Sequence, residues 1–214
     1  MHRKKLIIFP FNGNGREALD CIDEDQYDFL GFIDDDPEKQ SSQYEIFRRS
    51  ILDEYQETYV LAVPGSPITF NCRKKAISSL GLTSGRFANV VHPRATIGRN
   101  VVLGRNCLIM AGVVITSNAK LGNHICILPN TVIHHDVQVY DYTLIGSNVV
   151  IAGGTIVGEN CYIGSGSNII NGINIGDLSL VGLGSNVIRD VESSATVAGN
   201  PAMPLKINIR QPLF

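Results

Sequence analysis

Residues Val139–Gly164, VYDYTLIGSNVVIAGGTIVGENCYIG, repeat a six-residue pattern in which an aliphatic residue is often followed by glycine. The spacing extends in both directions, from Val91 to Val187, without an insertion. All seventeen positions of this series hold Val, Ile or Leu: Val91, Ile97, Leu103, Ile109, Ile115, Leu121, Ile127, Ile133, Val139, Ile145, Ile151, Val157, Ile163, Ile169, Ile175, Val181 and Val187. A period of six matches neither a helix nor an ordinary strand. It predicts a parallel β-helix of short strands, with aliphatic side chains stacked inward and glycine or asparagine at tight corners.

The rest of the composition follows from this repeat. The chain has 214 residues, a net charge of −2, 7% aromatic residues and no tryptophan. Residues 1–90 hold 25 of the 38 charged residues, whereas residues 91–192 hold 11 of them together with 14 of the 21 glycines. Two segments of different composition, and by inference of different fold, therefore meet near residue 90. A narrow β-helix core explains the scarcity of aromatic side chains in the second segment.

Composition also excludes several classes of protein. A net charge near zero argues against a nucleic-acid partner, which needs a basic face to neutralise phosphates. The apolar stretch Leu6–Phe9 is too short for the core of a signal peptide, and no window of about 18 apolar residues predicts a membrane span. Five cysteines without a CxxC motif indicate neither a disulfide framework nor a zinc ribbon. These features predict a cytoplasmic protein that binds neither membrane nor nucleic acid.

Residues 1–90 have the alternation of a small parallel βαβαβ sheet. We expect strands over 6–11, 29–34 and 59–63, helices over 15–22, 43–54 and 68–80, and an extended segment, 87–91, that leads into the β-helix.

Two loops of this segment contain candidate nucleotide contacts. Gly13, Asn14 and Gly15 follow the first predicted strand, where backbone N–H groups can approach a phosphate. Acidic residues at the end of the second strand can accept hydrogen bonds from a ribose or a base. These are Asp34, Asp35 and Asp36, within GFIDDDP. The full GxGxxG pattern is absent, so an ordinary tight turn and a solvated acidic loop are the alternative interpretation.

Four stretches carry a resemblance that covers nearly the whole chain: PFNGNGR at 10–16, GFIDDDP at 31–37, VHP at 91–93 and VAGNPA at 197–202. With the hexads, they resemble the NeuD/PglD-type sugar acyltransferases of the hexapeptide-repeat family. The resemblance implies a Rossmann-like α/β domain over 1–90, a left-handed parallel β-helix over 91–202 and a tail over 203–214. It also implies a homotrimer that uses acetyl-CoA, without a metal, to acetylate the amino group of a nucleotide-linked amino sugar.

The candidate catalytic residues are His135 and Asp136, with His134 as the base and a purely structural His134–His135 pair as the alternatives. Histidine suits proton transfer at neutral pH, and an adjoining carboxylate can orient the ring and stabilise the imidazolium. The family places its catalytic histidine, followed by an acidic residue, in this hexad. Three hexads per coil make 18 residues, so His135 is expected to stack beside Gly153, whose N–H could face an oxyanion.

The resemblance assigns acetyl-CoA to Gly153 and Gly154 and to the closing motif Gly199-Asn200-Pro201. Two positions depart from the family, which often has a histidine where this chain has Asn14 and Leu144.

Three alternatives remain open from sequence. The same scaffold could acetylate a hydroxyl, as a sialic-acid type O-acetyltransferase does, or it could be a non-catalytic scaffold. A β-helix enzyme of the carbonic-anhydrase type needs several histidines on one zinc. His124 and His135 lie eleven residues apart, which is not a multiple of the coil length, and no third histidine stacks with them.

Overall fold

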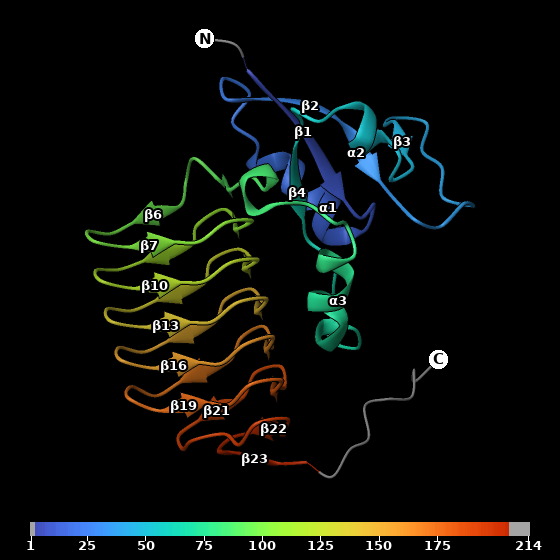
Figure 1. Cartoon of the computed structure of the whole chain (residues 1–214). Coiled ribbons are helices and arrows are strands. Elements are labelled where there is room, and N and C mark those ends of the chain that lie inside the picture. The colour runs from blue at the N-terminus through green and yellow to red at the C-terminus, as the bar shows by residue number, and fades with distance from the viewer. Residues whose placement is uncertain (1–2, 206–214) are drawn as a thin grey trace.

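The computed structural model describes residues 3–205, in which a small parallel sheet sits at one end of a long β-helix (Figure 1). The sheet has four parallel strands in the order β3-β2-β1-β4. Their bounds are β1 Lys4–Phe9, β2 Tyr27–Ile33, β3 Ile46–Phe47 and β4 Tyr59–Ala62. The helices around it are short: α1 Gly13–Glu17, α2 Ile51–Glu54 and α3 Arg73–Ser78, with 3-10 turns at Ala18–Cys21, Phe70–Cys72 and Ser84–Arg86.

The helix predicted over 43–54 is wrong in its first half. Ile46 and Phe47 form β3, which pairs in parallel with the end of β2, and the helix begins only at Ile51. Gly31 permits this pairing, because its φ is +151° and a Cβ there would lie 2.5 Å from the carbonyl oxygen of Glu45. Tertiary pairing thus overrides the helical tendency of a polar segment.

Residues 90–199 form the predicted β-helix, which consists of three parallel sheets. The first contains β5 Val90–Val91, β8 Leu108–Ile109, β11 Cys126–Ile127, β14 Leu144–Ile145, β17 Tyr162–Ile163, β20 Leu180–Val181 and β22 Thr196–Gly199, and is closed by the antiparallel β23 Ala202–Pro204. The second contains β6 Thr96–Ile97, β9 Val114–Ile115, β12 Val132–Ile133, β15 Val150–Ile151, β18 Asn168–Ile169 and β21 Asn186–Val187. The third contains β7 Val102–Leu103, β10 Lys120–Leu121, β13 Gln138–Val139, β16 Ile156–Val157 and β19 Asn174–Ile175.

The register confirms the coil length that the hexads predict. Val132 pairs with Val114 on one side and Val150 on the other, so neighbouring strands of a sheet are 18 residues apart. The second residue of nearly every strand points inward into one continuous aliphatic core, and Cys107 and Cys161 are buried there too. Asparagine, aspartate or glycine occupies most corners in the left-handed region, with φ between 54° and 74°. These residue types tolerate that backbone conformation best.

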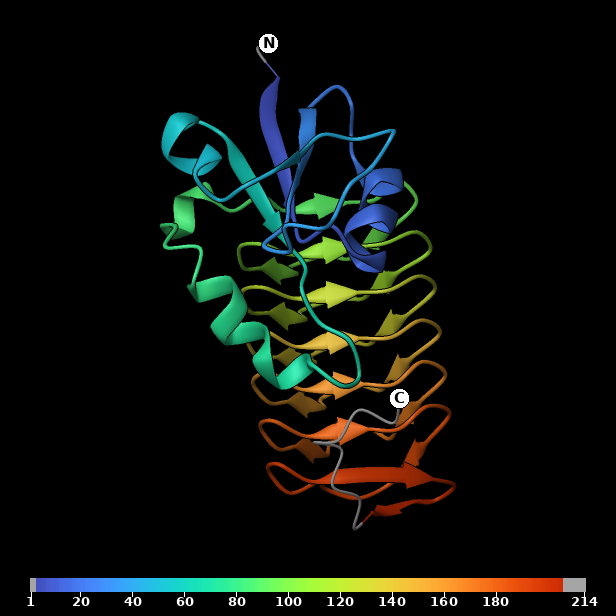
Figure 2. The same cartoon turned by 90° about the vertical axis from the view of Figure 1, so that its right-hand side faces the viewer.

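One face of the β-helix is covered by the N-terminal segment. The outward side chains of the eight-stranded sheet are buried against it: Leu108, Met110, Cys126, Leu144, Tyr162 and Leu180 pack with Leu6, Ile8, Phe32, Leu61, Val63 and Phe70. Leu144, where a family histidine was expected, is one of these packing residues. Figure 2 shows the chain running down this side of the coils after β4 and returning as α3.

A buried arginine fastens α3 to the coils. Arg73 is 1% exposed, and its guanidinium donates to the carbonyl oxygens of Pro64, of Tyr142 at 2.9 Å and of His124 at 2.8 Å. The side chain of Asn106 adds a second tie, because it accepts from the backbone N–H of β4 and donates to the carbonyl of the same residue. Within residues 3–205, no helix is long and apolar enough to cross a membrane.

Candidate active site

His135 and Asp136 form the corner that follows β12. Asp136 has a φ of 60°, which an aspartate tolerates better than most residues. Its N–H donates to the carbonyl oxygen of Ser117 in the preceding coil, and the carbonyl of His135 accepts from Gly154 in the next. The backbone of the pair is therefore fixed by the coils on both sides.

The two side chains face each other. Nδ1 of His135 lies 2.8 Å from Oδ2 of Asp136. A carboxylate only accepts hydrogen bonds, so in the neutral imidazole this contact places the proton on Nδ1 and leaves a lone pair on Nε2. Asn118, one coil earlier, donates from Nδ2 to the other carboxylate oxygen at 3.1 Å. The hydrogen bonds from His135 and Asn118 lower the pKa of Asp136 below its usual value.

Gly153 lies against the imidazole, as the 18-residue register predicts. A Cβ on Gly153 would be 2.6 Å from both Cε1 and Nε2 of His135, so only glycine leaves the ring in place. Within residues 3–205, the Gly153 N–H has no hydrogen-bond acceptor. The corner therefore combines a lone pair on Nε2 with an unpaired backbone donor on the adjoining coil.

His135, Asp136 and Gly153, which we call the catalytic corner after the role proposed for them below, are open on the outside. The side chains of His135 and Asp136 are 62% and 56% exposed. No cluster of three or more metal-ligating side chains occurs in the part of the chain that the structure describes. His124 lies at a different corner, stacked on the Tyr142 ring at 4.5 Å, and burial lowers its pKa to about 4.

The other acetyl-CoA candidates separate into two places. Gly154 adjoins the catalytic corner and has a φ of +69°, with open space where a Cβ would stand. Gly199 ends β22, and Asn200 and Pro201 form the turn from it to β23, which closes the far end of the β-helix (Figure 1). Three further strands of the second sheet follow β12 before that end, so the closing motif is not brought to His135.

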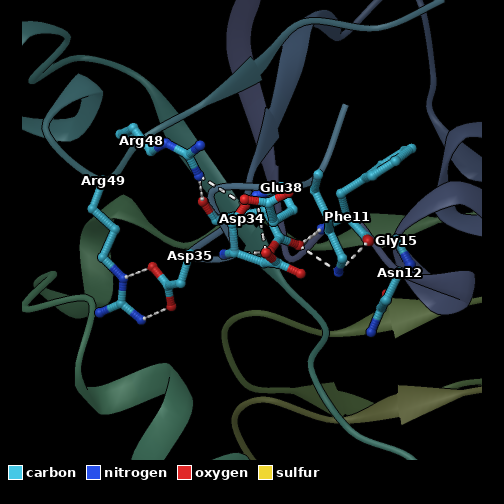
Figure 3. Close-up of polar contacts among 10 residues, drawn as sticks. Phe11, Asn12, Gly15, Asp34, Asp35, Glu38, Arg48 and Arg49 are labelled. Carbon is cyan, nitrogen blue, oxygen red and sulfur yellow. Dashed lines mark hydrogen bonds and ion pairs between the residues drawn. The ribbon is translucent and has the colours of Figure 1, made fainter. Parts of the chain in front are cut away.

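The acidic loop after β2 holds its first aspartate inside the fold (Figure 3). Asp34 is 4% exposed, and its carboxylate accepts from the Phe11 N–H at 3.0 Å, the Lys39 ammonium at 2.9 Å and the Asp36 N–H at 3.0 Å. These contacts join the loop after β1 to the loop after β2.

The next two aspartates differ in how much of their carboxylate is free. Both oxygens of Asp35 accept from Arg49 at 2.6 Å (Figure 3). Arg48 holds the loop by its backbone, donating to three carbonyl groups between 34 and 37. Asp36 is exposed and accepts from the Glu38 N–H with one oxygen, so its second oxygen faces solvent without a partner among residues 3–205.

The glycine-rich turn after β1 is ordered largely by its own side chains. Asn12 caps the short helix α1 by accepting from the Gly15 N–H at 2.8 Å (Figure 3). Asn14 donates to the carbonyl oxygen of Gly65 at 3.3 Å, whereas Gly13 has open space around its Cα. The structure thus brings this turn and the acidic loop to the carboxyl ends of neighbouring strands, β1 and β2.

Sequence reasoning missed Asn118 and the arginines that hold the acidic loop. The 18-residue register contains the signal for Asn118, because it stands one coil before Asp136. Nothing in the spacing of Arg48 and Arg49 indicates that they fold back onto the loop.

Comparison with known proteins identifies the repeat and the fold. Residues 94–128, 141–166 and 154–188 match the family model described as the hexapeptide repeat of succinyl-transferase. No curated protein matches the chain.

Several solved structures have the same fold over nearly the whole chain. The acetyltransferase domain of PglB from Neisseria gonorrhoeae FA1090, solved with acetyl coenzyme A, has a TM-score of 0.83 at 21% identity and covers 95% of this chain and 100% of its own. A variant of the perosamine N-acetyltransferase of Caulobacter crescentus, solved with CoA and GDP-perosamine, has a TM-score of 0.85 at 23% identity, covering 97% and 99%. WeeI from Acinetobacter baumannii AYE has a TM-score of 0.78 at 23% identity, covering 95% and 100%. The chain therefore contains a hexapeptide repeat over much of its β-helix and shares its fold with these structures over nearly its whole length.

Proposed function

We propose that the protein transfers the acetyl group of acetyl-CoA to the amino group of a nucleotide-linked amino sugar. The observation that carries the proposal is the catalytic corner, where Nδ1 of His135 is paired with Asp136, its Nε2 side lies against Gly153, and the Gly153 N–H has no acceptor among residues 3–205. The fold supports the substrate class, since PglB was solved with acetyl coenzyme A and the perosamine N-acetyltransferase with CoA and GDP-perosamine.

In the proposed reaction, the sugar amine attacks the thioester carbonyl carbon while Nε2 of His135 accepts the proton that the nitrogen loses. Asp136 holds the Nδ1 proton and stabilises the imidazolium. The Gly153 N–H donates to the developing oxyanion. The C–S bond then breaks, the amide forms, and the CoA thiolate takes up a proton as it leaves.

The nucleotide is assigned to the edge of the sheet at the carboxyl ends of β1 and β2. The order β3-β2-β1-β4 is the one found in Rossmann-like sheets, which bind ligands at this edge. Gly13 and Asp36 are its best contacts, because their surroundings are open, whereas Asp34, Asp35 and Gly15 are engaged within the fold. Asn14 is intermediate between these open and engaged residues, since its side chain makes a single hydrogen bond of 3.3 Å, to the Gly65 carbonyl.

The proposal includes a homotrimer of left-handed prisms in the cytoplasm, with acetyl-CoA held between neighbouring copies. It is supported by the openness of the catalytic corner, which lacks a second wall within residues 3–205, and by an outward stripe of Val114, Val132 and Val150 on the adjoining sheet. In this arrangement Gly154 lines the thioester end of the groove, and Gly199, Asn200 and Pro201 lie toward its far end.

The test is release of CoA thiol from acetyl-CoA with a panel of UDP-, dTDP- and GDP-linked amino sugars. We expect turnover with at least one of them, and His135→Ala should reduce it by about 10²- to 10⁴-fold, the usual contribution of a general base. His134→Asn is the matched control, because it changes the neighbouring histidine and should keep turnover within about twofold of wild type.

Each contrary outcome has a defined meaning. Unchanged turnover in His135→Ala would remove the proposed base. A product that hydroxylamine cleaves would be an ester rather than an amide, which would favour the O-acetyltransferase alternative. No turnover, together with no binding of acetyl-CoA by calorimetry, would indicate a non-catalytic scaffold.

A further inference from the structure

A chain of hydrogen bonds runs along the edge of the β-helix and ends at the catalytic corner. Asn100, Asn118 and Asp136 stand one coil apart, with φ values of 59°, 63° and 60°. Asn100 donates from Nδ2 to Oδ1 of Asn118 at 3.2 Å, and Asn118 donates from Nδ2 to Oδ1 of Asp136 at 3.1 Å. The two corners after Asp136 in this column are Gly154 and Gly172, which have no side chain to continue it.

The polarity of this chain determines how Asn118 faces Asp136. Because Oδ1 of Asn118 accepts from Asn100, its amide nitrogen is directed at the carboxylate. The carboxylate then has one oxygen on Asn118 and the other on His135. Two hydrogen bonds to different oxygens fix the plane of a carboxylate. An exposed aspartate with a single hydrogen-bond partner is not held in this way.

We propose that Asn118 is a positioning residue for the acetyl transfer and acts through Asp136. By holding one carboxylate oxygen, it keeps the other aligned with Nδ1 of His135, so that the imidazole stays against Gly153 with Nε2 available. This inference rests on the proposed function. It agrees with the lowered pKa of Asp136, to which hydrogen bonds from His135 and Asn118 both contribute.

The first experiment measures kcat and KM of Asn118→Gly. Glycine keeps the left-handed backbone of the corner and removes only the side chain. Loss of a residue that orients a catalytic partner should lower kcat on the order of 10-fold, while KM for acetyl-CoA and for the amino sugar stays unchanged. A kcat equal to wild type, with His135→Ala inactive, would overturn the inference and leave the proposed function intact.

A double-mutant cycle tests whether Asn118 acts through Asp136. In an Asp136→Gly background, Asn118→Gly should produce no further loss of kcat, because the group that it positions is already gone. A full additional loss would contradict a positioning role. Asn100→Gly is the comparison on the same corner column, and it should lower kcat less than Asn118→Gly does, since the Asn118 amide loses the partner that orients it but keeps its own bond to Asp136.

A readout that needs no turnover separates the inference from the proposed function. Carboxyl ¹³C NMR of Asp136 should give a higher titration midpoint in Asn118→Gly than in wild type. Asn118→Asp keeps the shape but replaces the donor with a second carboxylate, so its midpoint should rise further. An Asp136 midpoint that is the same in all three proteins would overturn the inference even if no sugar substrate is found.

Discussion

Buried threonines of the β-helix find their hydrogen-bond partners in the neighbouring coil, whereas the N-terminal segment uses arginines that each donate to several carbonyl groups. Thr131, Thr143 and Thr155 are buried in the β-helix, and each hydroxyl donates to a carbonyl fifteen residues later. In the N-terminal segment, Arg48 donates to three carbonyl groups of the acidic loop, and Arg73 donates to carbonyl groups of one loop and two β-helix corners. A repeated arrangement shares its stability over many equivalent contacts, while a unique arrangement depends on a few residues.

Arg73→Met should have the largest effect on stability. The substitution keeps much of the packing volume but leaves three carbonyl groups without their charged donor, at a cost of about 3–5 kcal/mol in the free energy of unfolding. Denaturant unfolding should detect the loss, and hydrogen exchange should place it in the N-terminal sheet rather than in the coils.

Lys75→Met is its control, because Lys75 is exposed on the same helix. The proposed difference between the two regions would be wrong if both substitutions lowered the free energy of unfolding equally, or if protection from hydrogen exchange were lost evenly along the β-helix.

Gly153→Ala should have the next largest effect, and on activity rather than stability. The new Cβ would stand 2.6 Å from the His135 ring, so the ring must move away from its position. A displacement of about 1 Å at a catalytic group can cost about 100-fold in rate. We expect kcat for thiol release to fall by about that factor with little change in melting temperature, because Gly153 has an ordinary φ.

Gly154→Ala makes the opposite change at the next residue. Its Cβ meets nothing within 4 Å, but a φ of +69° should cost about 1–2 kcal/mol of stability. Because Gly154 lines the proposed acetyl-CoA groove and leaves the His135 ring in place, its kinetic effect should fall on KM for acetyl-CoA rather than on kcat. Equal kinetic losses in the two variants would mean that the corner responds to any added methyl group.

Substitutions in the acidic loop should distinguish the structural role of Asp34 from the nucleotide contact proposed for Asp36. Asp34→Asn directs an amide at groups that themselves donate, and should cost about 1–3 kcal/mol of stability. Asp36→Asn should leave the unfolding free energy unchanged and raise KM for the nucleotide sugar. If Asp34→Asn raised KM without loss of stability, the division proposed for this loop would be incorrect.

The smallest effect concerns pH and the junction between the two regions. Burial, opposed by the negative charge of Asp141 and aided by the positive charge of Arg73, lowers the pKa of His124 to about 4. The unfolded chain therefore takes up a proton below about pH 6.5 while the folded chain does not, so stability is lost as the pH falls toward 4. Because part of the ring faces solvent, we expect a loss on the order of 1 kcal/mol between pH 7 and pH 5.

His124→Asn tolerates the positive φ of 61° at this corner and has no titratable ring. Its unfolding free energy should therefore lack this slope over the same pH range. A slope that persists in the variant would assign the effect to other groups.

The sequence by itself determined the β-helix, its 18-residue coil and the stacking of His135 on Gly153. Each of these follows from a period of six, because every coil pairs with the next at a constant offset and the register needs no information from elsewhere. The same reasoning could have found Asn118, which stands one coil before Asp136.

Only the tertiary structure decided which face of the β-helix is covered, which aspartates form ion pairs within the fold and where β3 lies. Leu144 became a packing residue because the N-terminal sheet lies on its face of the coils. Asp34 forms an ion pair with Lys39, and Asp35 forms one with Arg49. The physical reason is that these contacts join segments far apart in a chain without a repeat, where no spacing in the sequence records which partners will meet.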